Sequence, residues 1–263
     1  MGWYSVDEIL TPCTRLRLLL YNIRYATGAG AGFHLPVPGA GYLRNTSRNL
    51  GRITDFIRSQ SPDIAGLVEV DLGSVRASAI NQAEAIAHAL GHAPGYQNKY
   101  GLRSLNQRLP IVRKQGNAFL TRYPEAVQRC HYFDLGIKRL IMELELERVR
   151  LFLVHLSLRY SHRHHQMHHL LSLIKDSHKP VVVAGDFNTL HGDHEIRHFQ
   201  ETAGLASANT GNLPSWPSNR PSRQLDFILY GPGIEVTRFE LPQVRYSDHL
   251  PLVCDFEVRK RAG

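Results

Sequence analysis

Residues 140–158 read LIMELELERVRLFLVHLSL, and this stretch decides the class of fold. In its first half, Leu140, Met142, Leu144 and Leu146 alternate with Ile141 and three glutamates. Such a period of two predicts a half-buried strand. Val149–Leu158 follows after almost no gap, so the two strands are predicted to form an antiparallel hairpin. A hairpin argues against a sheet built only from parallel strands.

Outward from this hairpin, short apolar runs alternate with segments of helical periodicity. The predicted strands are Leu16–Tyr25, Ile64–Val70, Val181–Ala184, Gln224–Tyr230, Ile234–Phe239 and Leu252–Val258. The predicted helices are one that starts at Thr46 or Ser47 and stops before Pro62, then Ile80–Leu90, Ser161–Lys175 and Asp193–Thr202. Mixed units of this kind predict an α/β protein with two packed mixed β-sheets flanked by helices, a four-layer α/β/β/α sandwich. We expect one domain over residues 1–263, with its core at about 15–258.

The composition of the chain indicates its class of substrate and its cellular location. The chain carries 31 Lys and Arg against 23 Asp and Glu, a net charge of +8, which favours a polyanionic substrate or surface, although many basic proteins bind neither. Three cysteines without a CxxC pair disfavour a disulfide scaffold or a zinc ribbon and favour a cytoplasmic setting. Because no apolar run approaches the ~20 residues that span a bilayer, we expect a soluble monomer without stable membrane insertion.

Apolar strands repeatedly end in, or are interrupted by, polar side chains that can bind metal or phosphate. These are Asn22, Glu69, His155, Asp186, Asn188, Asp226, Asp248 and His249. One polar strand end is ordinary turn chemistry, but so many insertions are hard to explain in that way. A buried, unpaired carboxylate is costly, so these groups need partners or a metal ion. The pattern predicts an acidic site at one edge of the sheets.

The kinds of side chain in this set indicate the chemistry. Carboxylate and amide oxygens suit Mg²⁺ or Mn²⁺, whereas zinc would prefer more His or Cys. A magnesium site with two histidines points to cleavage of phosphate esters. The metal would neutralise the phosphate, a carboxylate would activate water, and the histidines would stabilise the charged transition state.

Seven strings along the chain resemble one superfamily, the endonuclease/exonuclease/phosphatase superfamily, in their order. They are LYNIR at 20–24, PDIAGLVEV at 62–70, GNAFLTRYP at 116–124, VHL at 154–156, GDFN at 185–188, LDFI at 225–228 and SDHLP at 247–251. Each string is modest alone, but the ordered set is specific, and the resemblance runs from about Arg15 to Val258. The superfamily's four-layer sandwich agrees with the architecture predicted above.

The resemblance implies a role for each residue. Glu69 would be the principal metal ligand, with Asn22 and Asp248 completing the metal site, and Asp186 would activate water. The phosphate contacts would be Asn188, His155 and His249, the last oriented by Asp226. Asn117 lies in a string that usually forms a strand near the site, so it ranks below these residues as a site candidate. The implied enzyme is a Mg²⁺- or Mn²⁺-dependent phosphodiesterase acting by in-line attack on nucleic acid, a phospholipid headgroup or a small phosphodiester. A phosphomonoesterase for sugar or inositol phosphates and a non-catalytic binding protein are the alternatives.

The sequence departs from two branches of the superfamily. The abasic-site endonucleases usually have a tyrosine where Val154-His155-Leu156 stands, which disfavours a role in abasic-site repair. In pancreatic deoxyribonuclease a glutamate supports the first histidine. No carboxylate lies between Glu84 and Glu125 to do so here, which leaves the partner of His155 open.

Several other features each have two interpretations. The basic residues Arg103, Arg108, Arg113 and Lys114 could grip a phosphate backbone or lie in a solvated loop. Trp216 could stack on a base or pack within its loop, and Phe33–Pro38 could touch a membrane or be an ordinary loop. The helix-spaced pairs His164/His168 and His165/His169, together with His191, His194 and His198, could bind metal or form ordinary helix surface.

Overall fold

The computed structural model describes residues 14–29, 46–98, 114–133, 140–190, 192 and 194–259. These residues form two six-stranded sheets. The first sheet has the order β11 (Ile234–Glu240), β12 (Leu252–Val258), β1 (Thr14–Asn22), β2 (Ile64–Asp71), β4 (Gln115–Thr121), β3 (Ala93–Asn98). The second has the order β5 (Val127–Tyr132), β6 (Leu140–Glu145), β7 (Arg150–His155), β8 (Val181–Asp186), β10 (Asp226–Tyr230), β9 (Ala206–Ser207).

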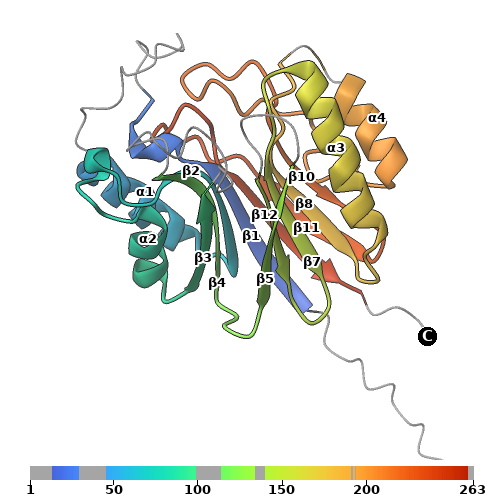
Figure 1. Ribbon diagram of the computed structural model, residues 1–263, viewed down its shortest axis with the longest axis horizontal. Coiled ribbons are helices and arrows are strands. Elements are labelled where there is room, and N and C mark those ends of the chain that lie inside the picture. The colour runs from blue at the N-terminus through green and yellow to red at the C-terminus, as the bar shows by residue number, and fades with distance from the viewer. Residues whose placement is uncertain are drawn as a thin grey trace, which may run out of the picture.

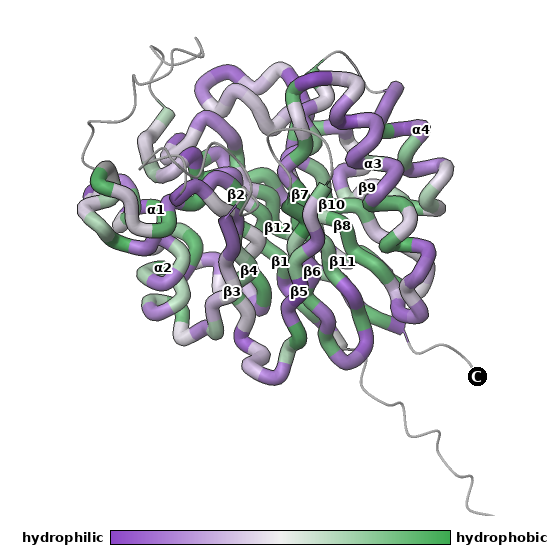
Figure 2. The backbone as a smooth tube through the Cα atoms, in the orientation of Figure 1, coloured by the Kyte–Doolittle hydropathy of each residue, from purple (hydrophilic) through white to green (hydrophobic). Residues whose placement is uncertain are grey.

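The sheets pack face to face, and helices cover their outer surfaces (Figure 1). Leu18 of β1 and Leu153 of β7 belong to the buried cluster between the sheets. The helices α1 (Ser47–Gln60) and α2 (Gln82–Leu90) pack on the first sheet, and α3 (Tyr160–Lys175) and α4 (His194–Ala203) pack on the second. Hydrophobic residues concentrate in the strands between these layers (Figure 2). The predicted four-layer sandwich is confirmed.

Both sheets are mixed, as the hairpin predicted. β6 and β7 pair antiparallel, whereas β1–β2 and β7–β8 are parallel pairs. The second parallel pair sets His155 opposite Asp186. Its strands approach closely at Gly185, where an added Cβ would lie 2.1 Å from the Val154 carbonyl oxygen. A glycine at this position therefore permits the spacing that puts His155 beside Asp186.

Several element boundaries differ from the predicted ones. β1 ends at Asn22 rather than Tyr25, because the chain enters a 3₁₀ turn, η1 (Arg24–Ala26), whose three residues all have positive φ. β7 likewise ends at His155 rather than Leu158. The strands β3 and β5 lie at sheet edges and were not predicted, since their sequences, APGYQN and VQRCHY, lack an apolar face.

The helix ends follow the predicted signals in part. α2 ends before Gly91, whose left-handed backbone (φ +66°) closes the helix as a glycine there should. Thr46 occupies the capping position of α1, but its side chain makes no capping hydrogen bond. In the described part of the chain, no helix has the length and apolar character that crossing a membrane would need.

Candidate active site

The predicted site residues gather where the ends of the two parallel strand pairs face each other across the sandwich. Asn22, at the end of β1, donates a hydrogen bond from Nδ2 to Oδ2 of Asp186, at the end of β8 (3.1 Å). His155 Nε2, at the end of β7, lies 3.4 Å from the same Asp186 oxygen and 3.7 Å from Oε1 of Glu69 in β2. Each sheet thus supplies part of one polar cluster.

Asp186 lies at the centre of this cluster and is 2% exposed. Its second oxygen, Oδ1, accepts a hydrogen bond from the backbone N–H of Asn188 (3.0 Å). Asn188 has a positive φ of 53°, a conformation that asparagine adopts at low cost, and its Nδ2 donates to the Leu156 carbonyl (2.9 Å). The turn after β8 therefore fixes Asp186 and Asn188 together against the end of β7.

Glu69 projects from an irregularity in β2. The pairing of β2 with β4 shifts register between Leu67 and Val70, and Glu69 within it has a φ of +57°. A left-handed backbone at a residue other than glycine or asparagine costs on the order of 1–3 kcal/mol, and such strain concentrates at functional sites. Buried Asn117 of β4 accepts a hydrogen bond at Oδ1 from the Glu69 N–H (3.4 Å), so it lies behind Glu69 and supports the irregularity.

His249 forms a buried ion pair with Asp226. Nδ1 of His249 lies 2.7 Å from Oδ2 of Asp226, and Nε2 lies 3.9 Å from Oδ2 of Asp186. Burial lowers the pKa of His249, but the charge and hydrogen bond of Asp226, with the charge of Asp186, outweigh it and raise the pKa to about 10. His249 is therefore protonated at neutral pH, donates from Nδ1 to Asp226 and presents an N–H at Nε2.

Two supporting residues were missed in the sequence. Ser215 Oγ donates to Oδ2 of Asp226 (2.7 Å) and accepts from the backbone N–H groups of Leu225 and Asp226 (3.2 Å each). Arg24 Nη1 lies 3.5 Å from Oδ2 of Asp248. Neither residue sits at the end of an apolar strand, which is the signal that marked the others.

Three of the site residues form a group that could hold a metal ion. Among the described residues, the ligand atoms of Asp186, Asp226 and His249 all lie within 4.8 Å of one another, and all three are buried. The predicted ligands Glu69 and Asp248 lie outside this group.

Side chains of α3 hold the loop that follows His155 in place. Arg163 is wholly buried and donates to both carboxylate oxygens of Glu195 (2.7 and 2.6 Å). Its Nη1 donates to the carbonyls of Ser157 and Leu158 (2.9 Å each), and Gln166 Oε1 accepts from the Ser157 N–H (2.8 Å). This network fixes the loop whose Leu156 carbonyl accepts the hydrogen bond from the Asn188 amide.

The structure describes only some of the features outside the active site that the sequence singled out. Arg103, Arg108, Arg113, the Phe33–Pro38 loop and His191 lie outside the described residues. Trp216 is half-buried in the loop that carries Ser215, where its backbone N–H donates to the Arg223 carbonyl (2.9 Å). Glu69 and Asp186 are the carboxylates that His155 lies nearest among its described ion pairs. Both carboxylates lie on the Nε2 side of the ring.

A comparison with known families identifies the family of this chain. The family model described as the Endonuclease/Exonuclease/phosphatase family matches residues 19–249. The chain belongs to this family. A UPF0294 protein of Yersinia pseudotuberculosis is 29% identical over 155 residues, which cover 58% of this chain and 53% of that protein. The chain thus spans about half the length of this curated relative.

Two solved structures show the same fold. A family member from Beutenbergia cavernae superposes with a TM-score of 0.70 at 19% identity, over 93% of this chain and 72% of that one. A mannosyl-6-phosphatase of Bacteroides thetaiotaomicron superposes with a TM-score of 0.65 at 16% identity, over 92% and 99% of the two chains. At these identities the likeness concerns the fold alone.

Proposed function

We propose that this protein is a metal-dependent phosphoric ester hydrolase, and specifically a phosphodiesterase that uses water activated by Asp186 for in-line attack. One observation carries the proposal. A buried carboxylate, Asp186, has hydrogen-bond donors on both oxygens and lies within 4 Å of two histidine nitrogens. A base fixed beside two imidazoles suits proton transfer from water next to a negatively charged phosphate.

Each residue has a distinct part in this mechanism. Asp186 takes the proton of the attacking water, and the Asn22 amide holds its carboxylate in place. His249, held by Asp226 at Nδ1, points its Nε2 proton toward the phosphoryl oxygens, and His155 offers a second donor. Asn188 binds the phosphate with the amide hydrogen that Leu156 does not use. Oriented donors at the place where negative charge develops lower the barrier most in a buried site.

The metal-ligand set that we favour is Glu69 with the side-chain oxygens of Asn22 and Asp248. The competing group uses Asp226 and His249, whose facing atoms already bind each other. Glu69 is 19% exposed and Asp248 15%, so their carboxylates reach the rim of the site, and their hard oxygens fit Mg²⁺ or Mn²⁺. Either ion, when bound there, would neutralise the phosphate and stabilise the leaving oxygen.

The test compares bis-para-nitrophenyl phosphate with para-nitrophenyl phosphate in the presence of Mg²⁺, Mn²⁺ or EDTA. We expect metal-dependent turnover of the diester and loss of activity in EDTA. Asp186→Asn should lower kcat by roughly 10²–10⁴-fold, the usual contribution of a general base. Asp176→Asn, at an exposed position after α3, is the matched control and should change nothing. Turnover of neither substrate with any metal would overturn the proposal, and activity that survives both EDTA and Asp186→Asn would overturn the mechanism.

Preference for the monoester would favour the alternative, a sugar or inositol phosphatase. Within the phosphodiesterase proposal, the net charge of +8 favours polyanionic substrates. A panel of plasmid DNA, RNA, sphingomyelin and phosphoinositides separates nucleic acid from phospholipid headgroups. Cytoplasmic location and a monomeric state stay predictions, checked by fractionation and by light scattering.

A further inference from the structure

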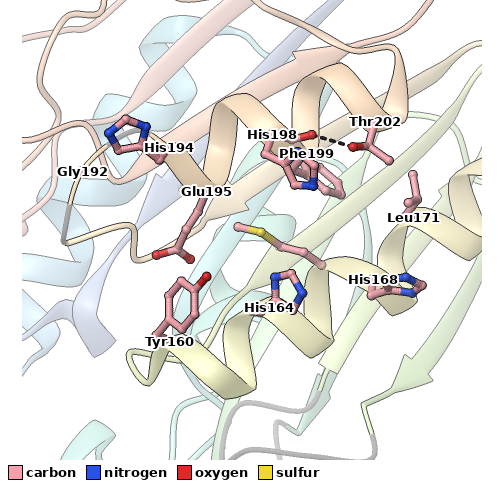
Figure 3. Close-up of a pocket in the computed structure, with 11 residues that line it drawn as sticks. Tyr160, His164, His168, Leu171, Gly192, His194, Glu195, His198, Phe199 and Thr202 are labelled. Atoms are coloured by element: carbon pink, nitrogen blue, oxygen red, sulfur yellow. Dashed lines mark hydrogen bonds between the residues drawn. The ribbon is translucent and has the colours of Figure 1, made fainter.

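A groove of roughly 520 Å³ lies between α3 and α4, on the outer layer of the second sheet (Figure 3). Its floor is apolar and includes buried Met167 and Phe199. Exposed imidazoles line its rim: His164 and His168 come from α3, and His198 comes from α4. None of these histidines belongs to the active site described above.

The two helices run in the same direction. α3 follows β7 and α4 follows β8 in the chain, and these two strands are parallel. The Arg163–Glu195 ion pair joins the first turns of the two helices. His198 follows Glu195 by three residues, and His164 and His168 follow Arg163 by one and five residues, so all three lie on the same side of this ion pair along the groove. Figure 3 shows His198 facing the His164 side of the groove.

His194 also lines the groove but stands one turn earlier on α4. It precedes Glu195 in the chain, so it lies on the other side of the ion pair from His168 along the helix axis. In Figure 3 it lies at the far end of the groove, beside Gly192. The helix register thus favours a set of three histidines without His194.

We propose that His164, His168 and His198 form a second metal site, for a divalent transition-metal ion of the Zn²⁺ type. Neutral imidazole is a preferred ligand of such ions, and residues four apart on a helix present their side chains on one face. Three histidine nitrogens with water in the fourth position complete a tetrahedral zinc shell. Mg²⁺, which prefers oxygen ligands, would not compete for this site.

In the structure the three rings stand apart. Among the described residues, their nitrogens do not all lie within 4.8 Å of one another. All three side chains are exposed, and the His164 ring stacks on Tyr160 with ring centroids 6.2 Å apart, so binding an ion requires rotation about side-chain bonds and release of this stack. An ion bound there would join the helices that follow His155 and Asn188, just outside the buried Arg163–Glu195 pair.

The experiment measures Zn²⁺ affinity of the full chain by calorimetry, with saturating Mg²⁺ present to compete for the proposed oxygen-rich active site. His198→Gln should weaken Zn²⁺ binding roughly 100-fold, because it leaves an isolated pair on one helix and removes the gain from linking ligands on two elements. The double variant His164→Gln/His168→Gln should weaken it at least as much. With Co²⁺, the intact site should give the strong visible absorption of a tetrahedral ion, and His198→Gln should lose it.

Two matched controls share the chemistry but not the position. His165→Gln/His169→Gln removes a pair with the same spacing on α3 that does not line the groove, and His194→Gln removes the histidine that the register excludes. Both should leave Zn²⁺ affinity unchanged. Because the readout is Zn²⁺ binding rather than turnover, failure of the proposed hydrolase activity would not touch this result. Absence of Zn²⁺ binding, or unchanged affinity in folded His198→Gln, would overturn the second site. Circular dichroism establishes folding, and His198→Asn is the substitute if His198→Gln fails that check.

Discussion

The buried cation at position 163 offers the sharpest test of how α3 supports the site. The guanidinium of Arg163 is wholly buried and binds Glu195 through two nitrogens and two loop carbonyls through a third. Arg163→Met would leave the Glu195 carboxylate, which is 12% exposed, without its countercharge. Removing one partner of a buried pair costs about 3–5 kcal/mol of unfolding free energy. Since 1 kcal/mol lowers Tm by roughly 2–4 °C in a domain of this size, Tm should fall by about 6–20 °C.

Urea unfolding followed by circular dichroism measures this loss directly. Arg197→Met, at an exposed position on α4, is the matched control and should change the free energy of unfolding by less than about 0.5 kcal/mol. Replacing both partners, in Arg163→Met/Glu195→Leu, should recover part of the loss, because no uncompensated charge stays buried. A loss below about 1 kcal/mol in Arg163→Met, the range of an exposed ion pair, would refute the reasoning.

Three further predictions follow from single contacts. Ser215→Ala removes the hydroxyl that orients Asp226 and should lower kcat in the diester assay, with an unfolding loss of about 1–3 kcal/mol; an unchanged kcat would exclude this positioning role. The hydrogen bond from Arg17 lowers the pKa of Asp255, so its stabilisation is complete above about pH 4, the unfolded value, and is lost as pH falls through the lower native pKa. Urea unfolding across this acid range should therefore show a weaker pH dependence in Asp255→Asn than in the parent. Gly185→Ala forces β7 and β8 apart and should cost about 1–3 kcal/mol together with most of the activity, and wild-type stability would contradict the close approach.

The layers of the fold were predictable from sequence because apolar periodicity reports burial directly. The hairpin at 140–158 and the runs before Asn22, Glu69 and Asp186 lie in the core, where one face or both faces must be apolar. β3 and β5 escaped prediction because an edge strand is half solvated and carries Gly, Pro and charged residues without penalty. Their pairing is decided by the neighbouring strand rather than by their own sequence.

The site was predictable wherever a polar residue broke an apolar strand, and only there. Ser215 lies in a loop and acts on Asp226 eleven positions later, so nothing local distinguishes it from other loop serines. The left-handed turn at Glu69 was equally hidden, because glutamate shows no preference for that backbone and the irregularity depends on pairing with β4. Such features follow from how segments meet, which one sequence does not state.

The geometry of the site depends on how the two sheets pack more than on any single strand. Asn22 and Glu69 belong to the first sheet, and His155 and Asp186 belong to the second, yet their contacts span 3.1–3.7 Å. In the part of the chain that the structure describes, no strand of one sheet pairs with a strand of the other, so strand pairing does not set this separation. It is set instead by core side chains, such as Leu153 packed against Gly66, where an added Cβ would lie 3.1 Å from a Leu153 methyl group. Because packed interiors transmit shifts of a few tenths of an ångström, residues that touch no substrate fix the distance between the base and its partners.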